Sequence, residues 1–172
     1  MTNGDAIDPT LFRRAMSSFA TGITVITTEV RGEIRGMTVN AFMSGSLEPP
    51  LCIVSVGKRA RTHDMLIAAG NFGVSILAQG QEKLCVHFGG KPFADLQPVF
   101  DYMGRTPVLP GASVTIAADI VACHECGDHS IFVGHIVHLR AGIAPPLVLH
   151  GGRFAALMYS DEEFAAPVID LW

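Results

Sequence analysis

Apolar and polar positions alternate along much of the chain with the period of two that marks β-strands. The two longest alternating runs cover residues 114–122 and 131–139, and Gly127-Asp128 between them predicts a turn that pairs them. Shorter apolar or β-branched runs predict further strands at residues 23–30, 34–39, 51–56, 72–77 and 147–149. We therefore expect a chain built mainly from strands.

Helical spacing is confined to short segments. Asp8 followed by Pro9 predicts a helix start, and apolar residues then recur at helical spacing until Gly22. Residues 91–111 contain four prolines, which exclude long regular structure. Two more short helices are predicted, over residues 61–69 and 81–88.

Many strands, few short helices and no βαβ alternation indicate a mainly β or α+β fold, an antiparallel β-barrel with short peripheral helices. The 172 residues suit a single domain over 1–172, with a core at about 10–158 and a C-terminal tail at 159–172. The glycine fingerprint of the Rossmann fold is absent from the sequence, so any nicotinamide cofactor must bind by another route.

The composition is apolar, with 49% hydrophobic residues, 16% charged residues and a mean hydropathy of +0.37. We therefore expect a partner subunit to cover part of the surface. The net charge of −4 and the lack of a basic stripe argue against nucleic acid. No apolar run approaches the roughly 18 residues of a membrane span, and the first residues lack a secretory signal, so a cytoplasmic protein is expected. Four scattered cysteines do not form a disulfide framework.

Small hydroxyl, amide and methyl side chains gather at and after the end of the strand at 34–39. The set comprises Thr38, Asn40, Ala41, Ser44 and Ser46. It suits the polar edge of a flat heteroaromatic ring, since Asn and Ser offer donors and acceptors and small side chains expose the backbone. The same residues also suit an ordinary strand end, because Ser, Thr and Asn favour turns.

A second candidate segment follows the strand at 51–56, which opens through Gly57 into a basic helix start. Its residues are Ser55, Val56, Lys58, Arg61 and Thr62. Cations beside a helix N-terminus favour an anion such as phosphate, although the segment also suits a solvated basic surface. Taken together, the two segments indicate a ring with a phosphate tail.

Three further features admit two interpretations each. Cys123 and Cys126 have the spacing of half a zinc site, but no second pair is evident and residues three apart on a strand face opposite sides, so we expect no metal. His129, at a strand start, either reaches a pocket or is a surface turn histidine. Phe88, before two glycines, either caps a ring face or only ends a helix. His63 and His87 are assigned no role.

In chain order, six segments resemble the flavin reductase-like family, whose fold is the flavin-binding split barrel. The resemblance extends from Phe12 to about Leu157 and covers nearly the whole chain. The six segments are residues 19–27, 36–44, 46–51, 61–64, 127–134 and 152–154. Each is weakly specific alone, but their common order is highly specific.

The resemblance implies a homodimer with one flavin per subunit near the interface. Thr38, Asn40, Ala41 and Ser44 would contact the isoalloxazine ring, whereas Ser55, Val56, Lys58, Arg61 and Thr62 would hold the ribityl chain and phosphate. Phe88 would lie beside the flavin, and His129 would border the nicotinamide pocket. Gly45 and Gly89 depart from the family pattern and leave extra room near the ring, so the choice between FMN and FAD stays open.

The resulting hypothesis is an NAD(P)H:flavin oxidoreductase that supplies reduced flavin to a separate monooxygenase. Hydride would pass directly from nicotinamide C4 to flavin N5, with His129 positioning the nicotinamide. One alternative is a flavin-binding electron carrier without turnover of free flavin. Another is a reductase that uses tightly bound FMN to reduce a different acceptor. The choice between NADH and NADPH is also open.

Overall fold

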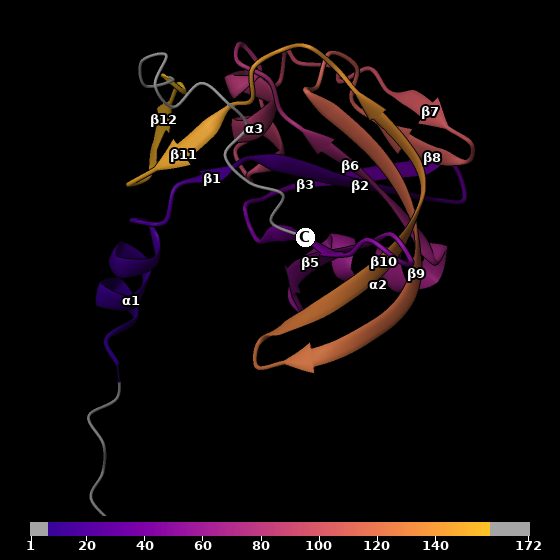
Figure 1. Cartoon of the computed structure of the whole chain (residues 1–172), viewed down its shortest axis with the longest axis horizontal. Coiled ribbons are helices and arrows are strands. Elements are labelled where there is room, and N and C mark those ends of the chain that lie inside the picture. Colours follow the sequence, from indigo (N-terminus) through magenta and orange to yellow (C-terminus); the bar gives the residue numbers. More distant parts are fainter. Residues whose placement is uncertain (1–6, 159–172) are drawn as a thin grey trace, which may run out of the picture.

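The structure is a computed structural model that describes residues 7–158. The predicted tail at 159–172 lies outside these residues. Seven antiparallel strands form the main sheet, in the order β3-β2-β6-β9-β10-β5-β4 (Figure 1). They are β2 (Thr24–Val30), β3 (Glu33–Val39), β4 (Phe42–Ser46), β5 (Leu51–Gly57), β6 (Asn71–Ile76), β9 (Val114–Cys126) and β10 (His129–Ala141).

The main sheet curls into a barrel. Its two edge strands, β3 and β4, are consecutive in the chain and are separated only by Asn40 and Ala41. Two short helices flank the sheet: α2 (Arg61–Ala69) contributes Leu66 to the core that fills the barrel, and α3 (Glu82–Phe88) packs on Gly36 of β3 through Phe88. The expected antiparallel barrel with short peripheral helices is therefore confirmed, as is the long β9–β10 hairpin.

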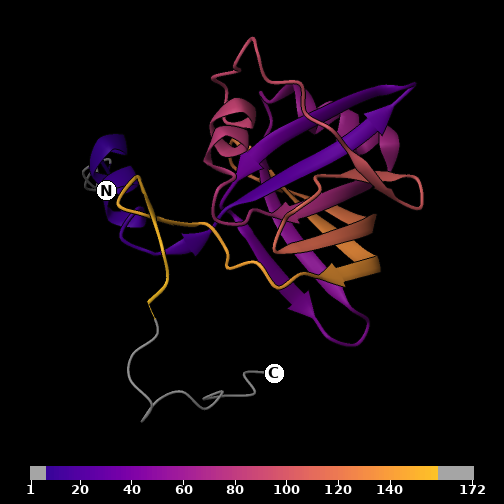
Figure 2. The ribbon, with the colours of Figure 1, turned by 90° about the horizontal axis from the view of Figure 1, so that it is seen from above.

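A small second sheet and a first helix extend from one side of the barrel. The sheet consists of β1 (Thr21–Gly22), β11 (Val148–His150) and β12 (Arg153–Ala155), and α1 (Pro9–Met16) precedes it. Figure 2 shows this arm from above, beside the barrel. A short hairpin, β7 (Asp101–Met103) with β8 (Thr106–Val108), is the regular structure found within the proline-rich segment.

The first helix begins as predicted and ends earlier than predicted. The Asp8 carboxylate accepts hydrogen bonds from the N–H groups of Thr10 and Leu11 at 3.1 and 3.2 Å, which caps α1. The predicted continuation to Gly22 is wrong, because α1 ends at Met16 and Thr21 pairs with Leu149 of β11. Tertiary pairing thus overrides the helical spacing of the apolar residues.

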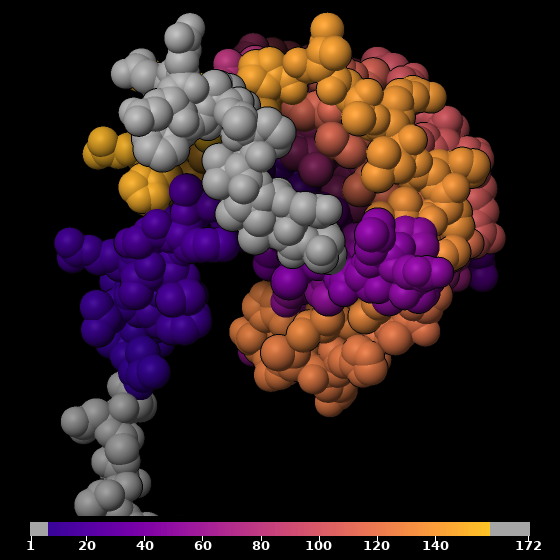
Figure 3. Space-filling view, viewed as in Figure 1, coloured from indigo at the N-terminus to yellow at the C-terminus, as the bar shows by residue number. Residues whose placement is uncertain are grey.

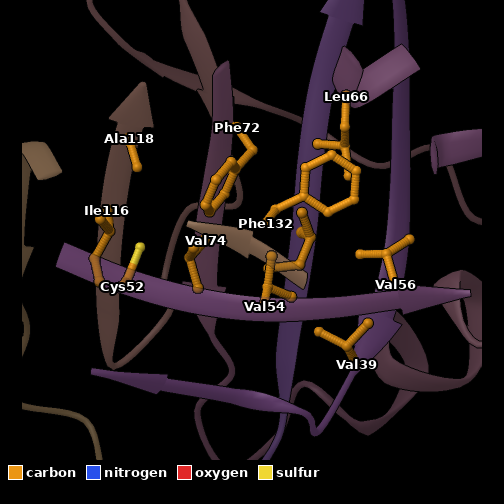
Figure 4. Packing of buried hydrophobic residues seen from close by; sticks show 11 residues of the cluster. Val39, Cys52, Val54, Val56, Leu66, Phe72, Val74, Ile116, Ala118 and Phe132 are labelled. Carbon is orange, nitrogen blue, oxygen red and sulfur yellow. The ribbon is translucent and has the colours of Figure 1, made fainter. Parts of the chain in front are cut away.

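The barrel is filled by apolar side chains from strands on all sides. Phe72, Phe132, Val54, Val56 and Leu66 are fully buried and point toward one another (Figure 4). Burial alternates along β5, so its even-numbered residues face this core while its odd-numbered residues face outward. The outward face of β5 is where the candidate site lies.

The edge strand β4 was not predicted from the sequence. Its residues Phe-Met-Ser-Gly-Ser lack a run of β-branched residues, and its pairing with β5 shifts register between Ser44 and Ser46. In the part of the chain that the structure describes, no helix has the length and apolar character needed to cross a bilayer.

Candidate functional site

A cavity of about 790 Å³ lies between the α1–β1 segment and the outward face of β4, β5 and β10. Most of its wall is apolar, and three polar residues, Thr21, Asn40 and Ser55, interrupt that wall. Such a wall suits a broad flat ring with polar atoms along one edge. The apolar side chains are Met16, Phe19, Phe42, Met43, Ile53 and Ile131.

Strand register explains why these side chains form one surface. Met43 lies opposite Ile53 across β4 and β5, and Ser55 lies opposite Ile131 across β5 and β10. Directly opposed residues share a face of the sheet, so the four form a continuous patch. The N–H of Ser55 also donates to the carbonyl oxygen of Ala41 at 3.0 Å, which holds the β3–β4 link against the end of β5. The two polar segments found in the sequence therefore lie together.

The cationic side of the site begins where β5 ends. Lys58 and Arg61 follow Ser55 closely, and α2 starts at Arg61 with Ala60 at the N-cap and no side-chain cap. The first N–H groups of a helix have no partner within the helix, and its dipole favours an anion there. The Lys58 ammonium lies 3.5 Å from the exposed carboxylate of Glu125, a surface pair that competes weakly with a bound anion.

A second hollow, of about 410 Å³, contains His129. Phe12 and Arg13 of α1 form its other wall. Nδ1 of His129 lies 2.8 Å from a carboxylate oxygen of Asp128, and this hydrogen bond lowers the pKa of the Asp128 carboxyl below its ordinary value. The interaction fixes the ring and leaves Nε2 as the other polar atom.

The two hollows follow one another along the same elements. His129 and Ile131 are two residues apart on one face of β10, a separation of about 7 Å. Phe12 and Met16 are one turn apart on α1. Figure 3 shows α1 separated from the β9–β10 hairpin, with an open gap between them. The site can therefore place two ligand groups next to each other.

Four residues expected at the ring or phosphate lie elsewhere or face away. Thr38 Oγ1 donates to the carbonyl oxygen of Cys85 at 2.7 Å and so faces α3. Ser44 lies opposite Cys52, on the face away from Met43. Val56 is fully buried in the core, which leaves only its main chain for a ligand.

Phe88 is the fourth of these residues. Its ring packs on Gly36 of β3, where an added Cβ would lie 2.7 Å from the ring. It lines a separate hollow of about 380 Å³, together with Phe100. By contrast, Asn40, Ala41 and Ser55 line the main cavity, and Lys58, Arg61 and the buried Thr62 follow directly.

The sequence did not point to the wall contributed by α1 and β1. Phe19 was interpreted as a helix position, and neither Met16 nor Thr21 was assigned a role in binding. The Thr21 hydroxyl is buried and has no hydrogen-bond partner within residues 7–158. A buried hydroxyl without a partner is unfavourable, and Thr21 is one of the residues that line the cavity.

Cys123 and Cys126 are free and exposed on β9. They lie opposite Phe132 and His129 of β10, so they project from opposite faces of the strand. Residues 7–158 contain no group of three or more side chains arranged to hold a metal ion.

Fold and site together define a barrel protein with a cavity that suits a ring-bearing phosphate ligand, beside a second small hollow. The chain belongs to the flavin reductase-like family: the family model described as "Flavin reductase like domain" matches residues 16–158. This match covers the residues of the main cavity and the cationic helix start, and of the second hollow it covers Asp128 and His129.

Curated relatives agree with this family. The chain is 38% identical over 154 residues to an NADH-dependent flavin reductase of a Rhodococcus species, covering 88% of each chain. It is 40% identical over 149 residues to the reductase component of 4-hydroxyphenylacetate 3-monooxygenase of Thermus thermophilus, covering 86% of this chain and 96% of that one.

Solved structures share the fold. The flavin reductase PheA2 superposes with a TM-score of 0.86 at 37% identity, covering 89% of this chain and all of that one. The Streptomyces globisporus NADH:FAD oxidoreductase SgcE6, in complex with NAD and FAD fragments, gives a TM-score of 0.80 at 35% identity, with coverages of 90% and 98%.

Proposed function

We propose that this chain catalyses the reduction of free FMN or FAD by NADH and releases the reduced flavin to a separate monooxygenase. The observation that best supports this proposal is the apolar cavity with a polar edge. The cavity continues into the cationic start of α2 and adjoins the hollow at His129. Relatives that are NADH-dependent flavin reductases and monooxygenase reductase components support the proposal.

The residues of the cavity fit a flavin. Phe19, Ile53 and Ile131 would hold the ring and exclude water, while Asn40 and Ser55 meet its polar edge. Lys58, Arg61 and the N–H groups at the start of α2 would hold the phosphate. Bound flavin supplies the hydride acceptor, N5, so the protein needs no nucleophile of its own.

His129 would position the nicotinamide. Its ring is fixed by the hydrogen bond to Asp128 and borders a hollow that adjoins the flavin cavity. A polar contact from Nε2 to the carboxamide would hold the nicotinamide ring within reach of the flavin. No proton transfer by His129 is needed for a direct hydride step.

One steady-state experiment tests the proposal. Catalytic amounts of protein are mixed with NADH and excess free flavin, and NADH oxidation is followed by absorbance. Many turnovers with diffusible reduced flavin are expected. A single stoichiometric reduction would contradict the proposal and favour an electron carrier. Replacing FMN by FAD and NADH by NADPH in the same assay gives the preference for each.

The exposed apolar side chains of α1 and of the segment that follows it support a homodimer as the working form. Leu11, Phe12, Met16 and Phe19 are each more than half exposed, at 61%, 53%, 56% and 77%. Contiguous exposed apolar side chains are usual at subunit interfaces. A second copy covering this helix would also close the two hollows that α1 borders, and sedimentation equilibrium is expected to give twice the chain mass. The exposed free thiols of Cys123 and Cys126 fit a reducing cytoplasm.

A further inference from the structure

We propose that His63 is a positioning residue that fixes the start of α2 relative to β10, and so fixes the phosphate-binding and nicotinamide-binding sides of the site relative to each other. No role for this histidine was predicted from the sequence. Its side chain is buried, and Nε2 lies 2.9 Å from Oγ of Ser130. The inference rests on the proposed function.

The two residues that this hydrogen bond joins are each next to a proposed ligand contact. His63 follows Arg61 and Thr62 in the first turn of α2. Ser130 follows His129 on β10. Because successive strand residues face opposite sides, Ser130 points into the barrel and His129 points toward its hollow. The buried hydrogen bond between His63 and Ser130 thus links the cationic start of α2 to the strand that carries the proposed nicotinamide contact, His129.

The other contacts of α2 do not hold its first turn against β10, so the placement of that turn depends on His63. The helix packs mainly against β2, β3 and β6. Within residues 7–158, the bond from His63 to Ser130 is the side-chain hydrogen bond that joins α2 to β10. The imidazole also packs edge-on against Phe132, with ring centroids 5.4 Å apart and an angle of 70°. The hydrogen bond to Ser130 and the ring contact with Phe132 together define how far the start of α2 lies from β10 and how it is oriented relative to that strand.

A purely structural histidine would have the same burial, so the test must separate stability from ligand placement. Removing one partner leaves the other buried and unpaired, which lowers stability, whereas replacing both with apolar groups is close to neutral. The variants are therefore His63→Leu, Ser130→Ala, the two together, and His63→Gln, whose amide nitrogen can reach the serine hydroxyl. Each is measured for its unfolding midpoint without ligand, its Kd for FMN by fluorescence quenching, and its KM for NADH and kcat.

The double variant is expected to regain most of the stability that each single variant loses. Its Kd for FMN and KM for NADH should nevertheless rise about fivefold, since a directional bond of about 1 kcal/mol is gone. His63→Gln should restore both ligand constants toward the wild-type values. Thr106→Val is the matched control, because it removes another buried bond, from Asn71 Nδ2 to Thr106 Oγ1 at 3.1 Å, away from the site. It should lower the unfolding midpoint and leave the Kd for FMN unchanged.

Wild-type Kd and KM in the stable double variant would overturn the role of His63. So would a loss of FMN affinity in Thr106→Val equal to that in the double variant. If the double variant does not regain stability, folded Ser130→Ala decides in its place, and wild-type ligand constants there overturn the inference. Failure of the unaltered protein to bind FMN would instead overturn the proposed function, so the two failures are distinguishable.

Discussion

The ring of His129 lies beside Gly57, its direct partner on β5, and a Cβ added to Gly57 would lie 3.6 Å from Nε2 of the histidine. That distance is an ordinary van der Waals contact, so a methyl group fits there and a branched side chain does not. The absence of a side chain at Gly57 therefore leaves the space in which the hydrogen bond to Asp128 holds the imidazole.

A leucine at Gly57 should displace the imidazole from its hollow. For Gly57→Leu we expect the KM for NADH to rise about tenfold, the equivalent of 1.4 kcal/mol of lost binding. Gly57→Ala, which places only a methyl group in contact with the ring, serves as the control and should stay near the wild-type KM. An equal rise for both variants would show that the backbone at Gly57, and not the space beside His129, sets NADH binding.

Removal of the imidazole tests the same contact directly. His129→Ala should raise the KM for NADH about tenfold while changing the Kd for FMN much less, because a hydrogen bond of this kind contributes about 1–2 kcal/mol. Steady-state kinetics and fluorescence quenching give the two constants. Asp128→Asn, which keeps an oxygen that can accept from Nδ1, should have a smaller effect. Equal losses of NADH and FMN binding in His129→Ala would contradict a nicotinamide-specific role.

The cationic start of α2 should act on the phosphate and not on the ring. In the double variant Lys58→Ala with Arg61→Ala, we expect the Kd for FMN to rise at least tenfold, since charge-assisted bonds to phosphate are among the stronger hydrogen bonds. Riboflavin carries the same ring without the phosphate, so its Kd should barely change. Arg105→Ala removes an exposed cation outside the site and is the control. An equal rise in the Kd values for FMN and riboflavin would show that Lys58 and Arg61 do not hold the phosphate.

Local patterns predicted the parts of the fold that local physics determines. The β9–β10 hairpin follows from strict alternation on both sides of Gly127, which has a φ of +61° that favours glycine. The helix α2 follows from its basic start and from Gly70, which ends it in the left-handed conformation. The short edge strand β4 was missed, because it is held by pairing with β5 and not by its own residue preferences.

The candidate site was predictable only where sequence neighbours stay neighbours in space. Ser55, Lys58 and Arg61 lie along one strand-to-helix connection, so the cationic side followed from their order. Phe88 and Thr38 were expected at the ring. Because α3 docks on β3, the Phe88 ring instead packs on Gly36, and the Thr38 hydroxyl donates to the carbonyl oxygen of Cys85. The apolar wall from Met16 and Phe19 depends on where α1 lies relative to the barrel, which no local pattern specifies.

The thiol of Cys52 gives a prediction about stability that does not depend on a ligand. Burial raises the pKa of Cys52 from its ordinary value of 9.0 to about 11. A raised pKa in the folded state means that the folded protein holds this proton more tightly than the unfolded chain. The resulting stability is complete below pH 9 and is lost as the pH rises toward 11.

The free energy of unfolding should therefore fall between pH 9 and 11 more steeply in the wild type than in Cys52→Ala. Urea unfolding at a series of pH values gives both curves, and their difference removes the contribution of other groups that titrate in this range. The pKa of Cys85 is also raised by burial, which is one reason why the comparison with Cys52→Ala is needed. Cys123→Ala, at an exposed position, should follow the wild-type curve. If the curves of the wild type and Cys52→Ala stay parallel up to pH 11, the thiol is not held protonated by the core.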